Sequence, residues 1–89
     1  MPTLTRSDPV SIWTEDGMPV RLVWGSTRYR VTDTPTPLFD EVAHPLLTHP
    51  HQRQIGWRFQ GTPDRGESRM FEVVRGSAPA EWVLLRVYD

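Results

Sequence analysis

Four arginines are the residues of this sequence best suited to holding a negatively charged ligand. Each falls out of phase with the apolar residues of a short alternating segment, so each side chain is expected on the outer face of a strand. If those strands are neighbours, the guanidinium groups converge on one face. The four are Arg21, Arg28, Arg30 and Arg58.

Trp13 adds an aromatic ring to this candidate face, because it is out of phase with the apolar Ile12 beside it. Sheet and barrel modules bind single-stranded nucleic acid by combining arginine contacts to phosphate with aromatic stacking on bases. The alternative is a solvated face on which the arginines pair across strands with Glu15, Glu72 or Glu81. Both interpretations stay open at this point.

Overall charge does not favour a general nucleic-acid binder, since the net charge is -1 and such proteins usually carry a basic domain. All ten basic residues are arginine, and the chain has neither lysine nor asparagine. A GC-rich genome explains this composition. Selection for planar, bidentate recognition of phosphate or carboxylate would also produce it, and composition alone does not separate the two.

The four tryptophans divide into two groups by their phase. Trp24 and Trp57 share the phase of apolar neighbours and are expected in the core. Trp13 and Trp82 are out of phase, and tryptophan is frequent at interfaces, so these two are candidates for a surface that binds a protein partner. For Trp82 the alternative is that residues 33–54 cover it.

Metal binding has weak candidates in a proline-rich segment. His49 and His51 flank a proline, His44 lies nearby, and Asp40 and Glu41 offer carboxylates. Two histidines and a carboxylate could together coordinate a metal ion. Histidines are also common in surface loops, and no closed ligand set is visible. We therefore expect no metal and no cofactor.

No pattern typical of catalysis is present. The chain has no cysteine nucleophile. Ser26, Ser68 and Ser77 sit in turn segments without a nucleophile-elbow pattern. Glu15 and Asp16 are adjacent carboxylates, but they fall in a predicted hairpin turn, where solvated turn chemistry explains them. We therefore expect a protein that is not an enzyme.

Alternating apolar residues predict an all-β fold. Turn signals such as Asp16-Gly17 separate short strands that follow one another as an antiparallel meander. The last strand is apolar on both faces, which is typical of a central strand or of one that closes a barrel. The expected architecture is a bent sheet or a small SH3-like barrel. Its six strands are expected at residues 10–14, 20–24, 28–31, 55–60, 68–75 and 81–88.

The same alternation predicts the core. The expected members are the residues in phase on the inner face of each strand. They are Ile12, Val20, Leu22, Trp24, Tyr29, Val31, Ile55, Trp57, Phe59, Phe71, Val73, Val83, Leu85 and Val87.

The chain is expected to form one domain over residues 10–89, preceded by a frayed N-terminus at residues 1–9. Residues 33–54 contain four prolines and are expected to form an irregular insertion. Within it, Thr36 and Pro37 have the types of a helix cap and a first helical residue. They favour either a short helix over residues 38–43 or an irregular loop.

The two ends of the chain resemble a small actinobacterial family of unknown function. The resemblance rests on residues 12–20, 23–25, 29–31 and 82–89, about half of the chain. Family members read approximately W-T-x-D-G-x-P, then W-x-G-x-x-Y-x-V, then W-x-L-x-R-V-Y-D. The middle of this chain departs from the pattern, with proline and histidine where members carry tryptophan and acids. Some members resemble accessory factors of translesion-type DNA polymerases, so the resemblance implies a shared fold and a DNA-repair setting.

The functional expectation is a non-enzymatic binding module. A protein-interaction accessory domain is the first interpretation, and a nucleic-acid-binding module that uses the arginine face is the alternative. No apolar run is long enough to cross a membrane, and residues 1–6 lack the apolar stretch of a signal peptide. We therefore expect a cytoplasmic protein that makes no membrane contact and is a monomer or a weak homodimer.

Overall fold

The structure, a computed structural model, describes residues 4–5, 8–42, 51–78 and 80–88. These residues form strands and turns, and among them no helix is long and apolar enough to span a membrane. The strands are β1 (Leu4–Thr5), β2 (Pro9–Glu15), β3 (Met18–Trp24), β4 (Thr27–Val31), β5 (Thr36–Val42), β6 (His51–Pro63), β7 (Arg69–Arg75) and β8 (Trp82–Tyr88).

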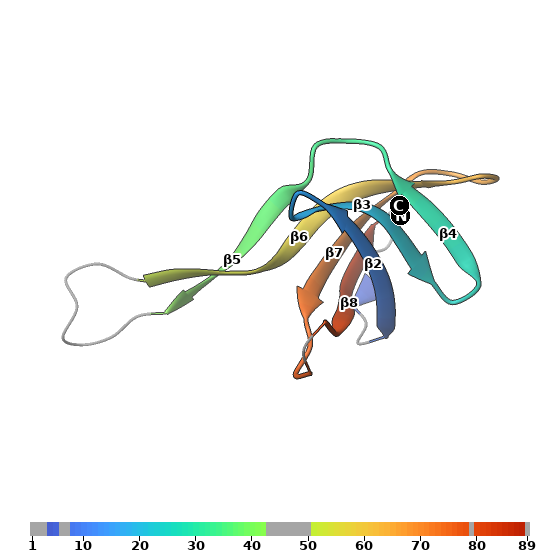
Figure 1. The fold of residues 1–89 in the computed structure, drawn as a ribbon. Helices are drawn as coiled ribbons and strands as arrows, with labels where there is room; N and C mark the ends of the chain where they lie inside the picture. Colours follow the sequence, from blue (N-terminus) through green and yellow to red (C-terminus); the bar gives the residue numbers. More distant parts are fainter. Residues whose placement is uncertain (1–3, 6–7, 43–50, 79, 89) are drawn as a thin grey trace.

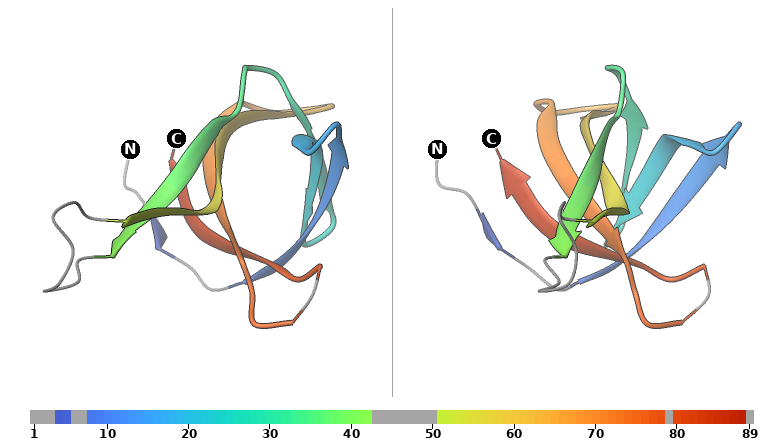
Figure 2. Two further views of the ribbon diagram at one scale, coloured as in Figure 1. Left: turned by 60° about the vertical axis from the view of Figure 1, so that its left-hand side comes forward. Right: turned by 90° about the vertical axis from the view of Figure 1, so that its left-hand side faces the viewer.

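Six strands close into an antiparallel barrel. They pair in the order β2, β3, β4, β6, β7 and β8, and β8 returns to β2 through the pairs Pro9–Val83 and Val10–Trp82. Figure 2 shows β2, β3 and β4 forming one side of the ring and β6, β7 and β8 the other. These are the six strands predicted from alternation, so the all-β class and the small SH3-like barrel are confirmed. Strand β1 adds to the end of β8.

The short helix expected over residues 38–43 is wrong, and so is the irregular loop expected as its alternative, because β5 occupies Thr36–Val42 and pairs antiparallel with β6, which begins at His51. A helix of one and a half turns has little stability of its own. The edge of the long strand β6 instead provides hydrogen-bond partners for the backbone N–H and C=O groups of residues 36–42. The two strands form an arm that leaves the barrel, as Figure 1 shows.

Gly56 is the residue of β6 at which its pairing with β7 ends and the arm formed with β5 begins to leave the barrel. A side chain here would collide with the backbone carbonyl of Val73 and approach the Cα of Val74 to 2.8 Å. Ile55, the residue before it, is the extra residue of a β-bulge, because Leu38 pairs with Gly56 and Phe39 with Gln54. Bulges bend strands and increase their twist, so the bend arises from these two adjacent positions.

The turn between β2 and β3 has two residues and lies within the turn segment that the sequence predicts. Asp16 and Gly17 both have positive φ, at 51° and 80°. This combination is typical of the type I′ turn, whose twist matches that of the flanking strands. The hairpin fixes the register that brings Trp13 opposite Arg21.

The core is centred on Phe71. Its ring contacts those of Tyr29, Phe59 and Trp24, with centroid separations of 4.8, 6.0 and 6.2 Å. The pairs with Tyr29 and Trp24 are edge-to-face, a geometry that adds to the stability gained from burial. The buried hydrophobic residues are Leu22, Tyr29, Phe59, Phe71, Val73, Trp82, Leu84 and Val87, and Val10, Ile12, Trp24, Val31 and Trp57 pack against them.

Strand β8 differs from the predicted core. Trp82 and Leu84 are buried, whereas Val83 and Leu85 are partly exposed and lie outside the core cluster. Leu85 is a bulge residue, because Val73 pairs with Leu84 while the neighbouring Glu72 pairs with Arg86. The extra residue inverts the alternation, so the inner face changes partway along the strand.

Val20 and Ile55 are outside the core cluster for the same reason. In β3 the partners of Trp13 and Thr14 are Arg21 and Pro19, which leaves Val20 as an extra residue. Pro19 is fully buried in its place. Strict alternation of inner and outer residues takes no account of a bulge. It therefore assigns both Val20 and Ile55 to the core incorrectly.

Candidate functional site

A row of registered side chains crosses the outer face of β2, β3, β4 and β6. Trp13 pairs with Arg21, Arg21 with Arg30, and Arg30 with Thr62. Directly opposed residues have Cβ atoms about 4.5 to 5.5 Å apart. Trp13, Arg21 and Arg30 are exposed, with half of the Trp13 surface (51%) open to solvent.

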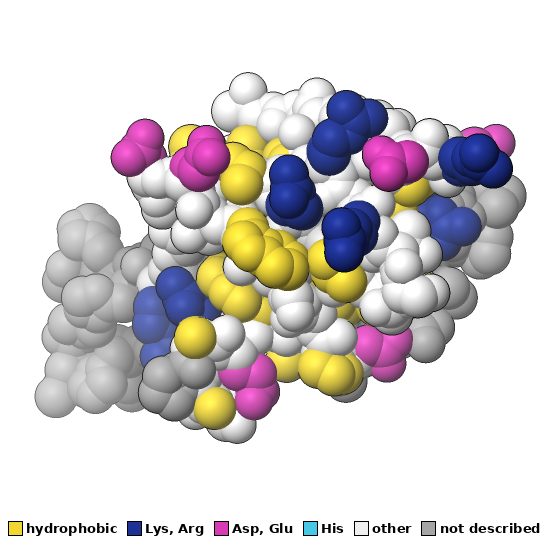
Figure 3. All heavy atoms as spheres, turned by 45° about the vertical axis from the view of Figure 1, so that its right-hand side comes forward, with side chains coloured by type: hydrophobic (Ala, Val, Ile, Leu, Met, Phe, Trp, Pro, Cys, Tyr) yellow, Lys and Arg dark blue, Asp and Glu magenta, His cyan; other side chains and the backbone are white. Residues whose placement is uncertain are grey.

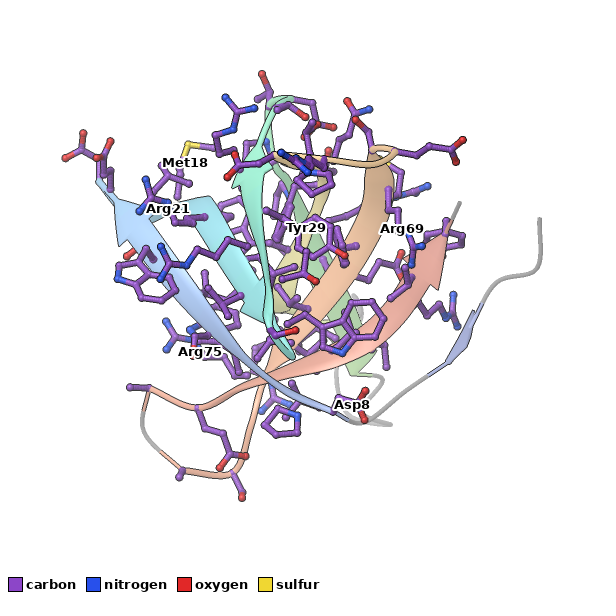
Figure 4. All side chains as sticks on the ribbon, turned by 90° about the vertical axis from the view of Figure 1, so that its right-hand side faces the viewer. Asp8, Met18, Arg21, Tyr29, Arg69 and Arg75 are labelled. Carbon is purple, nitrogen blue, oxygen red and sulfur yellow. The ribbon has the colours of Figure 1, made fainter. Side chains whose placement is uncertain are left out.

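Arg28 lies one step along the same face. It pairs with Val23 of β3, and Val23 pairs with Ser11 of β2. The predicted convergence therefore holds for three arginines and for Trp13. In Figure 4, Arg21 lies on the outer side of its strand, whereas Tyr29 of β4 lies toward the middle of the barrel, where it is buried.

Three adjoining hollows follow this face. The first, of about 330 Å³, is lined by Trp13, Arg21, Val23 and Arg28. The second adds Arg30 and has a volume of about 190 Å³. The third, of about 320 Å³, continues from Arg28 to the turn after β6. We call this surface the basic groove, and it comprises Trp13, Arg21, Val23, Arg28, Arg30, Asp64 and Arg65.

The basic groove carries four guanidinium groups against one carboxylate, that of Asp64. Figure 3 shows dark-blue side chains gathered beside a yellow hydrophobic area on this face. Within the described part of the chain, Arg21, Arg28 and Arg30 form no ion pair. The cross-strand pairing with glutamates considered from the sequence is therefore not made by these three residues there.

Arg58 lies apart from the basic groove. Strand β4 pairs with β6 at residues 61–63 alone, and Arg58 is opposite Thr36 of β5 and Glu72 of β7. Its guanidinium carbon is 5.3 Å from the centre of the Tyr88 ring. The sequence places Arg58 on an outer face correctly, but the register separates it from the other three.

A second polar cluster surrounds Glu72 on that other face. The Glu72 side chain is buried, and the guanidinium of Arg86 lies 3.8 Å from its carboxylate. A hydrogen bond to Tyr88, the charge of Tyr88 and the charge of Glu72 raise the pKa of Arg86 above its ordinary value. Arg86 therefore remains a cation, and the carboxylate of Glu72 offsets its charge.

A chain of hydroxyl groups borders the basic groove beside Arg30. Thr62 Oγ1 lies 2.8 Å from Thr32 Oγ1 and 2.7 Å from Ser68 Oγ. Neither Thr62 nor Arg65 is suggested by the sequence as a site residue. Both lie beside the groove because β4 pairs with the end of β6, and alternation along the sequence does not predict that pairing.

Trp82 is not on a partner surface. It is buried, and the guanidinium carbon of Arg75 lies 4.4 Å from the centre of its ring. Arg75 and Trp82 line a hollow of about 210 Å³ at the end of the barrel where the arm departs. Trp13 is thus the one of the two out-of-phase tryptophans that solvent reaches.

The weak metal candidates gain no support from geometry. His44 and His49 lie outside the described residues. His51 begins β6 opposite Val42. No cluster of three or more histidine, aspartate or glutamate side chains able to hold a metal occurs in the described ranges. Glu15 and Asp16 are exposed at the hairpin turn, where the sequence places them.

Comparisons of the chain with protein-family models, with curated proteins and with solved structures found no match.

Proposed function

We propose that this protein is a nucleic-acid-binding module that uses the basic groove. One observation carries the proposal: three guanidinium groups without ion-pair partners among the described residues lie beside an exposed indole on one barrel face. Guanidinium groups bind phosphate oxygens in a bidentate way, and an exposed aromatic ring provides a surface on which a base stacks. No step of this binding requires a cofactor or a catalytic group.

The net charge of -1 does not oppose this proposal, because the charges are separated in space. Glu15, Asp16 and Asp33 line a different hollow beside Met18, between the β2–β3 turn and the segment after β4. A local excess of positive charge steers an anionic ligand toward its own face even when the whole domain is near neutral.

The test is fluorescence anisotropy with labelled single-stranded and duplex DNA at low salt. The triple variant Arg21→Ala, Arg28→Ala, Arg30→Ala should lose binding of both. Arg58→Ala is the matched control, since it removes an exposed arginine of another face and should leave binding unchanged. Equal binding by the wild type and the triple variant would refute the proposal.

A second candidate function, interaction with a protein partner, is favoured by the arm. Phe39 of β5 is 53% exposed, and within the described residues β5 pairs with β6 alone. Open strand edges are templates for pairing with another chain. Crosslinking in cell extract would compare two variants, Phe39→Glu on the arm and Trp13→Glu on the basic groove. The variant that loses a crosslinked partner identifies the surface that the partner requires. The cytoplasmic location and the DNA-repair setting remain predictions.

A further inference from the structure

The first hollow of the basic groove has a composition that phosphate binding does not require. Its lining combines the indole of Trp13 and the half-buried side chain of Val23 with the guanidinium groups of Arg21 and Arg28. A phosphate is held by the cations alone. An aromatic wall and an aliphatic floor favour instead a flat, largely apolar ring.

The register explains why this hollow is open. Trp13 is opposite Arg21, and Val23 lies two residues farther along β3 on the same face, so Trp13 and Val23 are diagonal neighbours. Diagonal positions in an antiparallel pair are about 7 to 8 Å apart. The residue directly opposite Val23 is Ser11, which is small and exposed. On the β2 side, therefore, no large side chain covers Val23 beside the indole.

Building on the proposed function, we propose that this hollow holds one unstacked base of a single-stranded nucleic acid. The base stacks on Trp13 above Val23, and Arg21 and Arg28 contact its phosphates or the acceptors on its edge. Arg30 and Arg65 continue the groove for the adjoining phosphates.

This arrangement selects single strands over duplexes. Bases in a duplex are stacked and paired, so they offer no free face to the indole. A duplex can reach only the arginines, whereas a single strand gains both the arginine contacts and the stacking. Trp13 therefore determines which form binds better, and the arginines determine whether any form binds.

The experiment compares three ligands of equal strand length, about 12 nucleotides. They are a single strand, a duplex of the same sequence, and an abasic strand that has no bases. The wild type should bind the single strand more tightly than the other two. Trp13→Ala should weaken binding of the single strand by roughly 5- to 150-fold and leave binding of the other two unchanged. Trp13→Phe, which keeps an aromatic ring, should retain part of the preference.

Two results would overturn this inference and leave the proposed function intact. One is a wild type that binds the abasic strand as tightly as the normal strand. The other is a Trp13→Ala variant that loses affinity for all three ligands by the same factor. If none of the three ligands binds even at low salt, both the inference and the proposed function are wrong. Trp13 is exposed, so its replacement should leave the fold intact, which the urea midpoint of each variant verifies.

Discussion

Arg21 and Arg30 are directly opposed on β3 and β4, on the outer face of the barrel. Neither has an ion-pair partner among the described residues. Like charges in directly opposed positions destabilise a sheet. The fold therefore tolerates a local repulsion, and a bound phosphate between the two guanidinium groups would relieve it.

Reversing one of these charges should separate stability from binding. Arg30→Glu places a carboxylate opposite Arg21 and should raise the free energy of unfolding by about 0.2 to 1 kcal/mol. The same change should abolish DNA binding, because it removes a cation and adds a repelling charge. Urea unfolding and anisotropy measure the two effects. Arg30→Ala is the control, with intermediate stability. A less stable Arg30→Glu that still binds DNA would contradict this account of the pair.

Salt dependence should report the number of phosphates held. Each neutralised phosphate of a single strand contributes about -0.7 to the slope of log K against log salt. Phosphate contacts by all four arginines of the basic groove therefore predict a slope of about -3. Arg28→Ala should reduce its magnitude by about 0.7, whereas Arg58→Ala should leave it unchanged. A slope near zero in the wild type would show that phosphate contacts do not drive binding.

The bulge in β8 predicts unequal losses of stability for substitutions at two adjacent leucines. Leu84 is fully buried, whereas Leu85 is the partly exposed extra residue. Leu84→Ala should lower the free energy of unfolding by about 2 to 5 kcal/mol. Leu85→Ala should cost less than about 1 kcal/mol, because it leaves no core cavity. Urea unfolding followed by tryptophan fluorescence measures both. A larger loss of stability for Leu85→Ala than for Leu84→Ala would show that Leu85, and not Leu84, faces the core.

These leucines also show where alternation in the sequence is reliable and where it is not. Strands without an internal bulge, such as β4, have the inner face that the sequence predicts, with Tyr29 buried and Arg28 and Arg30 exposed. Val20, Ile55 and Leu85 are all extra residues of bulges, and alternation wrongly predicts all three in the core. A bulge depends on how a strand meets its partner, so one strand's own residues do not reveal it.

The candidate site follows the same logic. Trp13, Arg21, Arg28 and Arg30 were predictable because they lie on neighbouring strands joined by tight turns, where register follows from the turns. The sequence wrongly groups Arg58 with them, because a long connection separates β6 from β4. Its pairing with β4 begins only at Gly61, and nothing local to Arg58 sets that register.

Gly56 should be intolerant of any side chain. Gly56→Ala would force its new Cβ against the Val73 carbonyl, and overpacking of this kind costs about 1 to 3 kcal/mol. The thermal midpoint should fall. Thr36→Ala, an exposed change on the facing strand β5, is the control and should have little effect. If Gly56→Ala melted at the wild-type temperature, β6 would not bend where the structure bends it.

The most direct test of the basic groove is an amide NMR titration of the labelled protein with a short unlabelled single strand, first at low and then at physiological salt. We predict salt-sensitive shift changes at Trp13, Arg21, Val23, Arg28 and Arg30, including the Trp13 indole proton. An absence of shifts at low salt, or shifts confined to β5 and the start of β6, would contradict the proposal that this groove binds nucleic acid.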